Sequence, residues 1–154
     1  MEENNWIINL TWIDSWIFRT MNWNADEMIA VWRVIKAWFP CSRVDVTNAK
    51  YDAIVDIWWA KKLLRIQIKW TWNNSINFTG GTRSWQQISR EAESRKYKYS
   101  EKDCDLIIWI NTNNWECYII PINEIKDWWD SKSLMKLQKY KENWQILIDM
   151  AKDK

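Results

Sequence analysis

Apolar and polar residues alternate with a period of two along residues 52–69. Successive side chains of a strand point to opposite sides, so the alternation predicts strands at 52–57 and 63–69, joined as a β-hairpin. The apolar face comprises Ala53, Val55, Ile57, Leu64, Ile66 and Ile68, and the polar face Asp52, Asp56, Arg65, Gln67 and Lys69. A strand pair buried on both faces would not alternate in this way, so we expect the polar face to be directed outward.

Apolar residues recur at helical spacing in two other segments. The first, residues 24–38, begins at the candidate N-cap Asn24 and carries the stripe Met28, Val31, Ile35 and Trp38. The second, residues 133–150, predicts a closing helix with the stripe Leu134, Leu137, Tyr140, Trp144, Leu147 and Ile148. A further helix is expected at 84–97, which lacks Gly and Pro and is rich in Gln, Arg, Glu and Lys.

Shorter apolar runs predict strands at residues 42–46, 76–78, 104–110 and 116–120. The resulting order of helices and strands indicates an α/β domain in which a mixed sheet is flanked by helices. A chain of 154 residues has room for one such core. Residues 1–24 fit neither pattern clearly, so we treat them as an N-terminal arm of uncertain structure and 25–154 as the folded domain.

Composition and charge exclude several classes of protein. No run of 18 apolar residues and no basic, apolar leader is present, so we expect a cytoplasmic protein without a membrane span. Three cysteines and no histidine support neither a disulfide framework nor a Cys/His zinc site. The net charge of +2 is too small to indicate a nucleic-acid partner by itself. Basic residues are nevertheless concentrated between Arg83 and Lys102, where two interpretations stay open: a solvated helix face or a DNA-binding surface.

Sixteen tryptophans and two glycines are far from ordinary usage. Trp115 lies between two apolar runs, Trp58 and Trp59 lie at the hairpin turn, and Trp38 lies at a helix end, all places that favour glycine. We hypothesise that most tryptophans replace glycine in the natural protein because UGA codons were read under the wrong genetic code. UGG codons at 58, 59 and 115 would contradict this. Trp6, Trp128 and Trp144 lie in contexts less typical of glycine.

The polar face of the hairpin carries three side chains that could form a catalytic site. If Ile57 pairs with Lys62 across the turn, Asp52 lies directly opposite Gln67, with Lys69 two residues further along. Directly opposed residues have Cβ atoms about 4.5–5.5 Å apart, so a carboxylate, an amide oxygen and an ammonium group would converge. Oxygen ligands suit Mg²⁺, and a nearby lysine can offset negative charge in phosphodiester hydrolysis. A solvated amphipathic hairpin is the alternative.

Four stretches resemble the PD-(D/E)xK nuclease superfamily, and in particular its small group I intron homing endonucleases, in which Gln replaces the usual second acid. They are KYDAIVD at 50–56, KLLRIQIK at 62–69, YIIPINEI at 118–125 and KYKENWQIL near the C-terminus. The resemblance covers roughly residues 25–147. It implies a restriction-endonuclease-like α/β fold. The proline that names the motif is absent, since Lys50 and Tyr51 precede Asp52.

The resemblance also implies roles for particular residues. Asp52 would be the metal-binding acid, Gln67 the second sheet ligand, Lys69 the catalytic lysine, and Glu27 the helix acid at a metal-bound water. Asp26 is adjacent to Glu27; we prefer Glu27 because it lies nearer the expected core stripe of Met28 and Val31. The implied cofactor is Mg²⁺, with Mn²⁺ as an alternative. A first-turn acid that only stabilises the helix dipole is the competing interpretation.

The implied substrate is double-stranded DNA, cut by a homodimer or homotetramer because one such site cleaves one strand. Candidate backbone contacts are Arg83, Arg90, Arg95, Lys96 and Lys98, and candidate base contacts are Asn73, Asn74, Asn77, Gln86 and Gln87. Three alternatives remain: a structure-selective nuclease of the Holliday-junction type, a restriction enzyme, and a catalytically decayed DNA-binding module.

Overall fold

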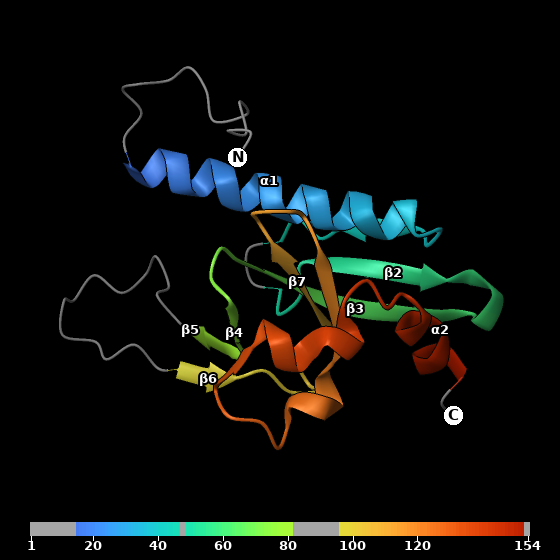
Figure 1. The fold of residues 1–154 in the computed structure, drawn as a ribbon. Helices are drawn as coiled ribbons and strands as arrows, with labels where there is room; N and C mark the ends of the chain where they lie inside the picture. The colour runs from blue at the N-terminus through green and yellow to red at the C-terminus, as the bar shows by residue number, and fades with distance from the viewer. Residues whose placement is uncertain (1–14, 47–48, 82–95, 153–154) are drawn as a thin grey trace.

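A five-stranded mixed sheet forms the centre of the protein, as seen in a computed structural model that describes residues 15–46, 49–81 and 96–152 (Figure 1). Its strands lie in the order β1 (Cys41–Arg43), β2 (Ala53–Ile57), β3 (Lys62–Thr71), β7 (Leu106–Asn111) and β8 (Cys117–Pro121). Only the β3–β7 pair is parallel. This α/β architecture confirms the fold class expected from the sequence.

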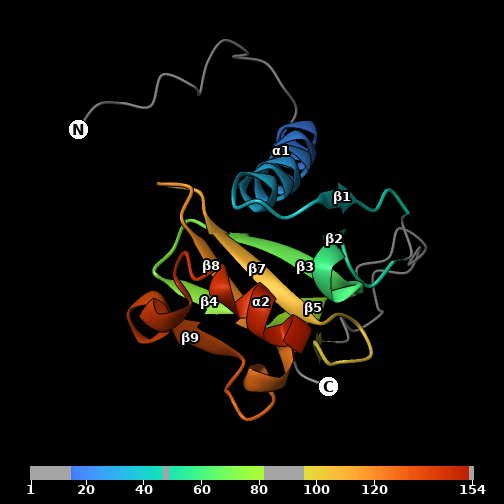
Figure 2. The same cartoon turned by 90° about the vertical axis from the view of Figure 1, so that its right-hand side faces the viewer.

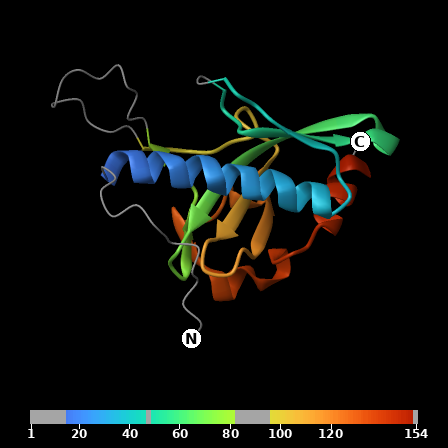
Figure 3. The same cartoon turned by 90° about the horizontal axis from the view of Figure 1, so that it is seen from above.

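Smaller elements surround this sheet. Two short ribbons are formed by β4 (Ser75–Asn77) with β9 (Ser131–Ser133) and by β5 (Thr79–Gly81) with β6 (Lys96–Lys98). The helices of the described ranges are α1 (Ser15–Lys36), α2 (Gln145–Lys152) and three 3₁₀ segments, η1 (Trp58–Ala60), η2 (Ile122–Ile125) and η3 (Leu134–Tyr140). Helix α1 lies across one side of the sheet, with β1 beside it (Figures 2 and 3). No helix in the described ranges is long and apolar enough to cross a membrane.

Both faces of the sheet are covered. On one face, Ile66 and Ile68 of β3 join α1 and Leu147 of α2 in one apolar cluster. On the other, Ile107 and Trp109 of β7 join residues of the ribbons, η2 and η3 in a second cluster. The polar face of the hairpin is therefore less open than its alternation suggested: Gln67 is only 6% exposed. The prediction of an outward polar face is wrong for this residue, because the second cluster is built by segments distant in sequence.

The hairpin itself has the expected register. Ile57 pairs with Lys62 and Ala53 with Ile66, and the Asp52 amide donates to the Ile66 carbonyl at 2.8 Å. The turn differs in one detail, since Lys61 rather than a tryptophan adopts a left-handed conformation, with φ of 51°. The strands expected at 42–46, 76–78, 104–110 and 116–120 are all present, with ends shifted by up to three residues.

Helix α1 corrects three expectations. It begins at Ser15, so residues 15–24 are helical and Asn24 is not its N-cap. Its buried residues are Asp26, Ala30 and Val34, whereas Met28, Ile35 and Trp38 are exposed. Val31 is partly buried against the core, but the rest of the expected stripe faces away from the sheet. A helix with two apolar stripes has no internal signal that says which one is buried.

The expected closing helix at 133–150 is interrupted. The chain forms β9, then η3, and becomes α-helical only at α2. Between η3 and α2, Glu142 has φ of 50°, and its carboxylate accepts hydrogen bonds from the Cys117 amide and the Arg33 guanidinium. The predicted burial of Leu134, Leu137, Tyr140 and Leu147 is confirmed. These buried positions come from two short helices rather than one long helix.

The helix expected at 84–97 lies mostly outside the described residues. Its last two residues, Lys96 and Tyr97, belong to strand β6, so that end of the prediction is wrong. The reason is the pairing of β6 with β5, a contact with Thr79–Gly81 that local helix propensity does not anticipate.

Candidate active site

Asp52 and Gln67 meet at the start of the hairpin. The Gln67 Nε2 atom and the Ile68 amide both donate to Asp52 Oδ2, the latter at 2.7 Å. These bonds hold the carboxylate while Asp52 Oδ1 and Gln67 Oε1 remain the oxygens suited to bind a cation. Burial raises the pKa of Asp52, and the Ile68 amide, Lys69 and Gln67 oppose this increase. The convergence expected from the strand register is therefore observed.

Lys69 completes the patch from the same side of β3. Its ammonium nitrogen lies 5.3 Å from the ring centroid of Tyr99. Lys69 also interacts electrostatically with Asp52 and Glu27, lowering the pKa of each. The patch thus contains a carboxylate, an amide and an ammonium group, the set expected from the sequence.

Glu27 lies on α1 within electrostatic reach of the same patch. Burial raises its pKa, the nearby Asp52 raises it further, and Arg43 and Lys69 lower it. Arg43, on β1, holds the Glu27 carboxylate in an ion pair with Nε–Oε2 of 3.2 Å. Sequence reasoning missed Arg43, which no motif singles out because its contact depends on how β1 lies beside α1.

Asp26 points in a different direction from Glu27. It lies on the buried side of α1 with Ala30 and Val34 and is 7% exposed. Burial raises its pKa to about 6. Asp52 affects the pKa of Glu27, whereas burial is the cause of the raised pKa of Asp26. The expected core stripe does not account for this, because Met28 is exposed.

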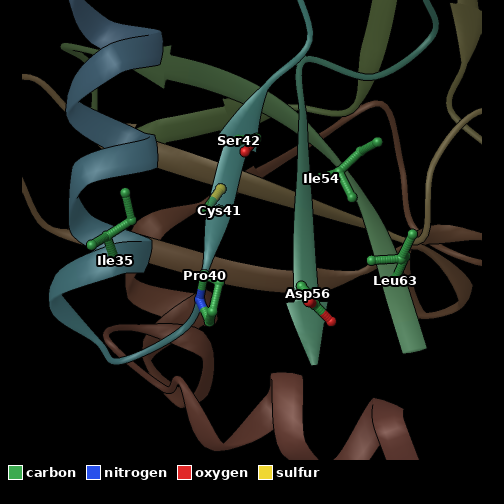
Figure 4. Close-up of a pocket in the computed structure, with 7 residues that line it drawn as sticks. All are labelled: Ile35, Pro40, Cys41, Ser42, Ile54, Asp56 and Leu63. Atoms are coloured by element: carbon green, nitrogen blue, oxygen red, sulfur yellow. The ribbon is translucent and has the colours of Figure 1, made fainter. Parts of the chain in front are cut away.

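Asp56 lies outside the patch. It shares a strand face with Asp52, but its cross-strand partner is Leu63. With Ile35, Pro40, Cys41, Ser42, Ile54 and Leu63 it lines a shallow hollow beside the edge strand β1 (Figure 4). Four residues of strand separate the two acids by roughly 13 Å.

The candidate DNA contacts differ in position. Arg83, Arg90, Arg95, Gln86 and Gln87 lie outside the described residues, and for Lys96 only the backbone is described. Lys98 donates from Nζ to the carbonyls of Lys126 and Trp128, so its ammonium is occupied within the protein. Asn73, Asn74 and Asn77 are exposed. Lys50, which was not a candidate, lies near the patch, with Nζ 4.7 Å from the ring centroid of Tyr97.

The oxygens of the patch fit a hard divalent cation. Asp52 Oδ1 and Gln67 Oε1 are the kinds of atom that Mg²⁺ binds, and Glu27 is close enough to influence Asp52 electrostatically. In the described ranges, no three His, Cys, Asp or Glu side chains form a metal-binding group. A cation here would therefore be held by few protein ligands and keep several waters, which is ordinary for Mg²⁺.

The fold and this patch define a class. A mixed sheet with an acid at the start of one strand, an amide and a lysine on the next, and an acid on a flanking helix resembles the arrangement of a restriction-endonuclease-like nuclease. A family model described as PD-(D/E)XK endonuclease matches residues 24–153. The chain belongs to this family and is a DNA endonuclease. Enzymes of the family use divalent metal ions.

A solved structure supports the fold independently. The bacterial homing endonuclease I-Ssp6803I superposes with a TM-score of 0.70 at 14% identity, over 85% of this chain and 93% of that one. At this identity the likeness concerns the fold. No curated protein sequence matches.

Proposed function

We propose that the protein is a Mg²⁺-dependent endonuclease that cleaves double-stranded DNA in the manner of a homing endonuclease, with Mn²⁺ as a substitute ion. The convergence of Asp52, Gln67 and Lys69 on one patch is the observation that supports it most strongly. The fold likeness to a homing endonuclease supports the choice of subclass.

Each residue of the patch has a distinct task. Asp52 and Gln67 would hold the metal through their side-chain oxygens, and Glu27 on α1 would orient a water. The bound ion would polarise the scissile phosphate and lower the pKa of a water molecule. Lys69 offsets the charge that develops on the phosphate and positions the attacking water. The Ile68 amide and Gln67 Nε2 fix the Asp52 carboxylate, so that it does not have to reorganise during the reaction.

Plasmid nicking tests the reaction. The wild-type protein should convert supercoiled DNA to nicked or linear DNA in Mg²⁺ or Mn²⁺, with 5′-phosphate ends, and EDTA should abolish the activity. Lys69→Ala should reduce the rate by ~10²-fold or more, whereas Lys132→Ala, a lysine outside the patch, should not. A wild-type protein that binds DNA but never nicks the plasmid, and from which Lys69→Ala does not differ, would instead favour a decayed DNA-binding module. Equal cleavage by the two proteins would refute the role of Lys69.

The subclass needs a different experiment. The alternatives are a junction-resolving enzyme and a restriction enzyme of the same fold. A panel of linear duplexes with long target sites, random duplexes and four-way junctions separates them. We expect cleavage of a long, specific duplex; selective cleavage of junctions would contradict the homing assignment.

Helix α1 offers a surface for the dimer that duplex cleavage requires. On the side facing away from the sheet, Ile17, Met21, Met28, Trp32 and Ile35 are all exposed, and at about 100° per residue they lie within an arc of roughly 60°. The stripe is nearly symmetric about the bond between Asp26 and Glu27. A two-fold axis at this bond would place Met21 of one copy opposite Trp32 of the other, and Ile17 next to Ile35. An antiparallel contact with a second copy would satisfy two-fold symmetry and would not depend on Trp32 alone.

Sedimentation tests the dimer. The wild type should sediment as a dimer and Met28→Glu as a monomer, because the charge lies at the centre of the stripe. Met135→Glu, on a methionine that is even more exposed than Met28 but lies on η3, should leave the dimer intact. A monomeric wild type, or a dimer unaffected by Met28→Glu, would contradict this interface.

A further inference from the structure

Two tyrosines beside the active site form a row with two lysines. Tyr99 and Tyr97 have ring centroids 5.4 Å apart and planes at 74°. The Lys69 ammonium lies over the Tyr99 ring, 5.3 Å from its centroid, and the Lys50 ammonium lies over the Tyr97 ring, 4.7 Å from its centroid. We call Lys69, Tyr99, Tyr97 and Lys50 the lysine–tyrosine row. It links the patch to strand β6.

The row is built into the protein rather than resting on its surface. Tyr99 is 6% exposed, and burial raises its pKa to about 12, so the phenol stays neutral. Tyr97 pairs across the ribbon with Gly80. A Cβ atom at Gly80 would lie 2.6 Å from Tyr97 Cζ and 2.8 Å from its hydroxyl. One of the two glycines in the chain therefore provides the space in which the Tyr97 ring packs.

The contact with Tyr99 restricts the position of the Lys69 ammonium. A lysine side chain has four rotatable bonds, and its ammonium is attracted by the neighbouring carboxylate of Asp52. A direct ion pair would occupy the acid that is needed for the metal. The face of an aromatic ring also attracts a cation. Over the Tyr99 ring, the ammonium stays near Asp52, and among the described ion pairs none joins the two groups.

We propose that Tyr99 is a positioning residue for the Lys69 ammonium, and that Tyr97, seated on Gly80, holds the Tyr99 ring in place. The inference rests on the proposed function, because it assigns Lys69 its catalytic task. It adds two residues that the motif of the family does not contain. The aromatic ring of Tyr99 attracts the ammonium, so phenylalanine should substitute for Tyr99 without loss of this function, whereas leucine should not.

Kinetics separate positioning from binding. In single-turnover cleavage of duplex DNA, Tyr99→Leu should lower the rate about 10-fold while its DNA affinity, measured in EDTA, stays within about 2-fold of wild type. Tyr99→Phe should retain at least half of the wild-type rate. Tyr140→Leu is the matched control, since Tyr140 is a buried tyrosine of the same apolar cluster and also lies under a lysine, Lys139. At temperatures below the melting temperature of the variant, the cleavage rate of Tyr140→Leu should remain near that of wild type.

Gly80 provides a second test of the same row. Gly80→Ala should displace the Tyr97 ring and lower the cleavage rate about 3-fold. In a Tyr97→Leu background the same substitution should have no further effect, because the ring it displaces is gone. Additive losses would contradict the role given to Tyr97, and a Tyr99→Leu enzyme as fast as Tyr99→Phe would overturn the proposal for Tyr99.

A measurement without DNA distinguishes this inference from the proposed function. The ring current of Tyr99 should shift the ε-methylene proton resonances of Lys69 upfield, and Tyr99→Leu should remove that shift. Lys69→Arg identifies the resonances. An upfield shift in a protein that never cleaves DNA would support the lysine–tyrosine row and contradict the proposed endonuclease function. An active enzyme without the shift would contradict the lysine–tyrosine row.

Discussion

Asp52 and Asp56 are two acids on the same face of the same short stretch, yet only one has the surroundings of a catalytic group. Asp52 faces Gln67, accepts a hydrogen bond from the Ile68 amide and interacts with Lys69. Asp56 faces Leu63 and lines an apolar hollow. The difference is the partner that each acid meets across the strand. The strand register decides which side chains lie next to an acid, and these neighbours make Asp52, but not Asp56, a candidate catalytic residue.

The largest effect should come from removing the acids one at a time. Asp52→Asn should lower the cleavage rate by ~10³-fold, or about 4 kcal/mol of transition-state stabilisation, because the proposed metal site would lose its charged ligand. Asp56→Asn should change it by less than about 2-fold. Plasmid nicking at fixed Mg²⁺ measures both. Equal losses for the two variants would remove the distinction between the two acids.

The cross-strand partners give the next effect. Gln67→Leu should lower the rate by ~10²-fold, since it removes the proposed oxygen ligand and the hydrogen bond to Asp52 Oδ2. The converse change, Leu63→Gln, provides Asp56 with an amide partner. It should neither raise the rate nor rescue Asp52→Asn, because position 56 lacks the lysine and the helix acid. Restored activity in the double variant would contradict the account.

Asp26 and Glu27 extend the comparison to α1 and to pH. The folded pKa of Asp26, about 6, lies above its ordinary value of 3.8, so the folded state binds its proton more tightly than the unfolded state. Stability should therefore fall as the pH rises from about 4 to 6 and stay lower above it. Asp26→Asn should reduce this decline, leaving the part that the raised pKa values of Glu27 and Asp52 contribute, and increase the free energy of unfolding at pH 7.5 by on the order of 1–3 kcal/mol.

Urea denaturation across this pH range measures the effect. Glu27→Gln is the control, because Arg43 and Lys69 oppose the effect of burial on its pKa; it should lower cleavage about 10-fold and reduce the decline less than Asp26→Asn does. An undiminished decline in Asp26→Asn would show that other groups are responsible.

The hairpin was predictable because its information is local. Period-two alternation and a short turn determine the register, and the register brings Asp52 opposite Gln67. The lysine–tyrosine row was not predictable, although Tyr97 and Tyr99 lie in the basic segment between Arg83 and Lys102. The expected helix at 84–97 excluded the β5–β6 ribbon in which Tyr97 pairs with Gly80. The contact of Tyr99 with Lys69 of β3 joins segments distant in the sequence.

Helix α1 shows a second limit. Its sequence has an apolar stripe on the outer side and another on the buried side, where Asp26 takes the place of an apolar residue. Periodicity therefore identified the helix but selected the wrong face. The interruption at Glu142 has a similar cause, since the left-handed residue is held by hydrogen bonds to Cys117 and Arg33, far away in the sequence.

The smallest effect concerns the tryptophans. Trp38 and Trp115 have φ of 72° and 60°, a region that costs an ordinary residue about 1–2 kcal/mol, and Trp38 is 90% exposed. This supports the hypothesis that glycine is the natural residue at these two positions, while Trp58 and Trp59 show no such strain.

Trp38→Gly should therefore raise the free energy of unfolding by about 1 kcal/mol, and Trp58→Gly, at an exposed position with negative φ, should not. Thermal denaturation measures the pair. A destabilised Trp38→Gly would contradict the backbone argument, and UGG at codons 38 and 115 would refute the codon hypothesis itself.

The most direct test of the central claim is an anomalous-scattering crystal structure of the protein soaked with Mn²⁺. A manganese peak should lie within bonding distance of Asp52 Oδ1 and Gln67 Oε1, with the Lys69 ammonium nearby and none at Asp56. A peak at Asp56, or coordination that omits both Asp52 and Gln67, would contradict the assignment of this patch as the active site.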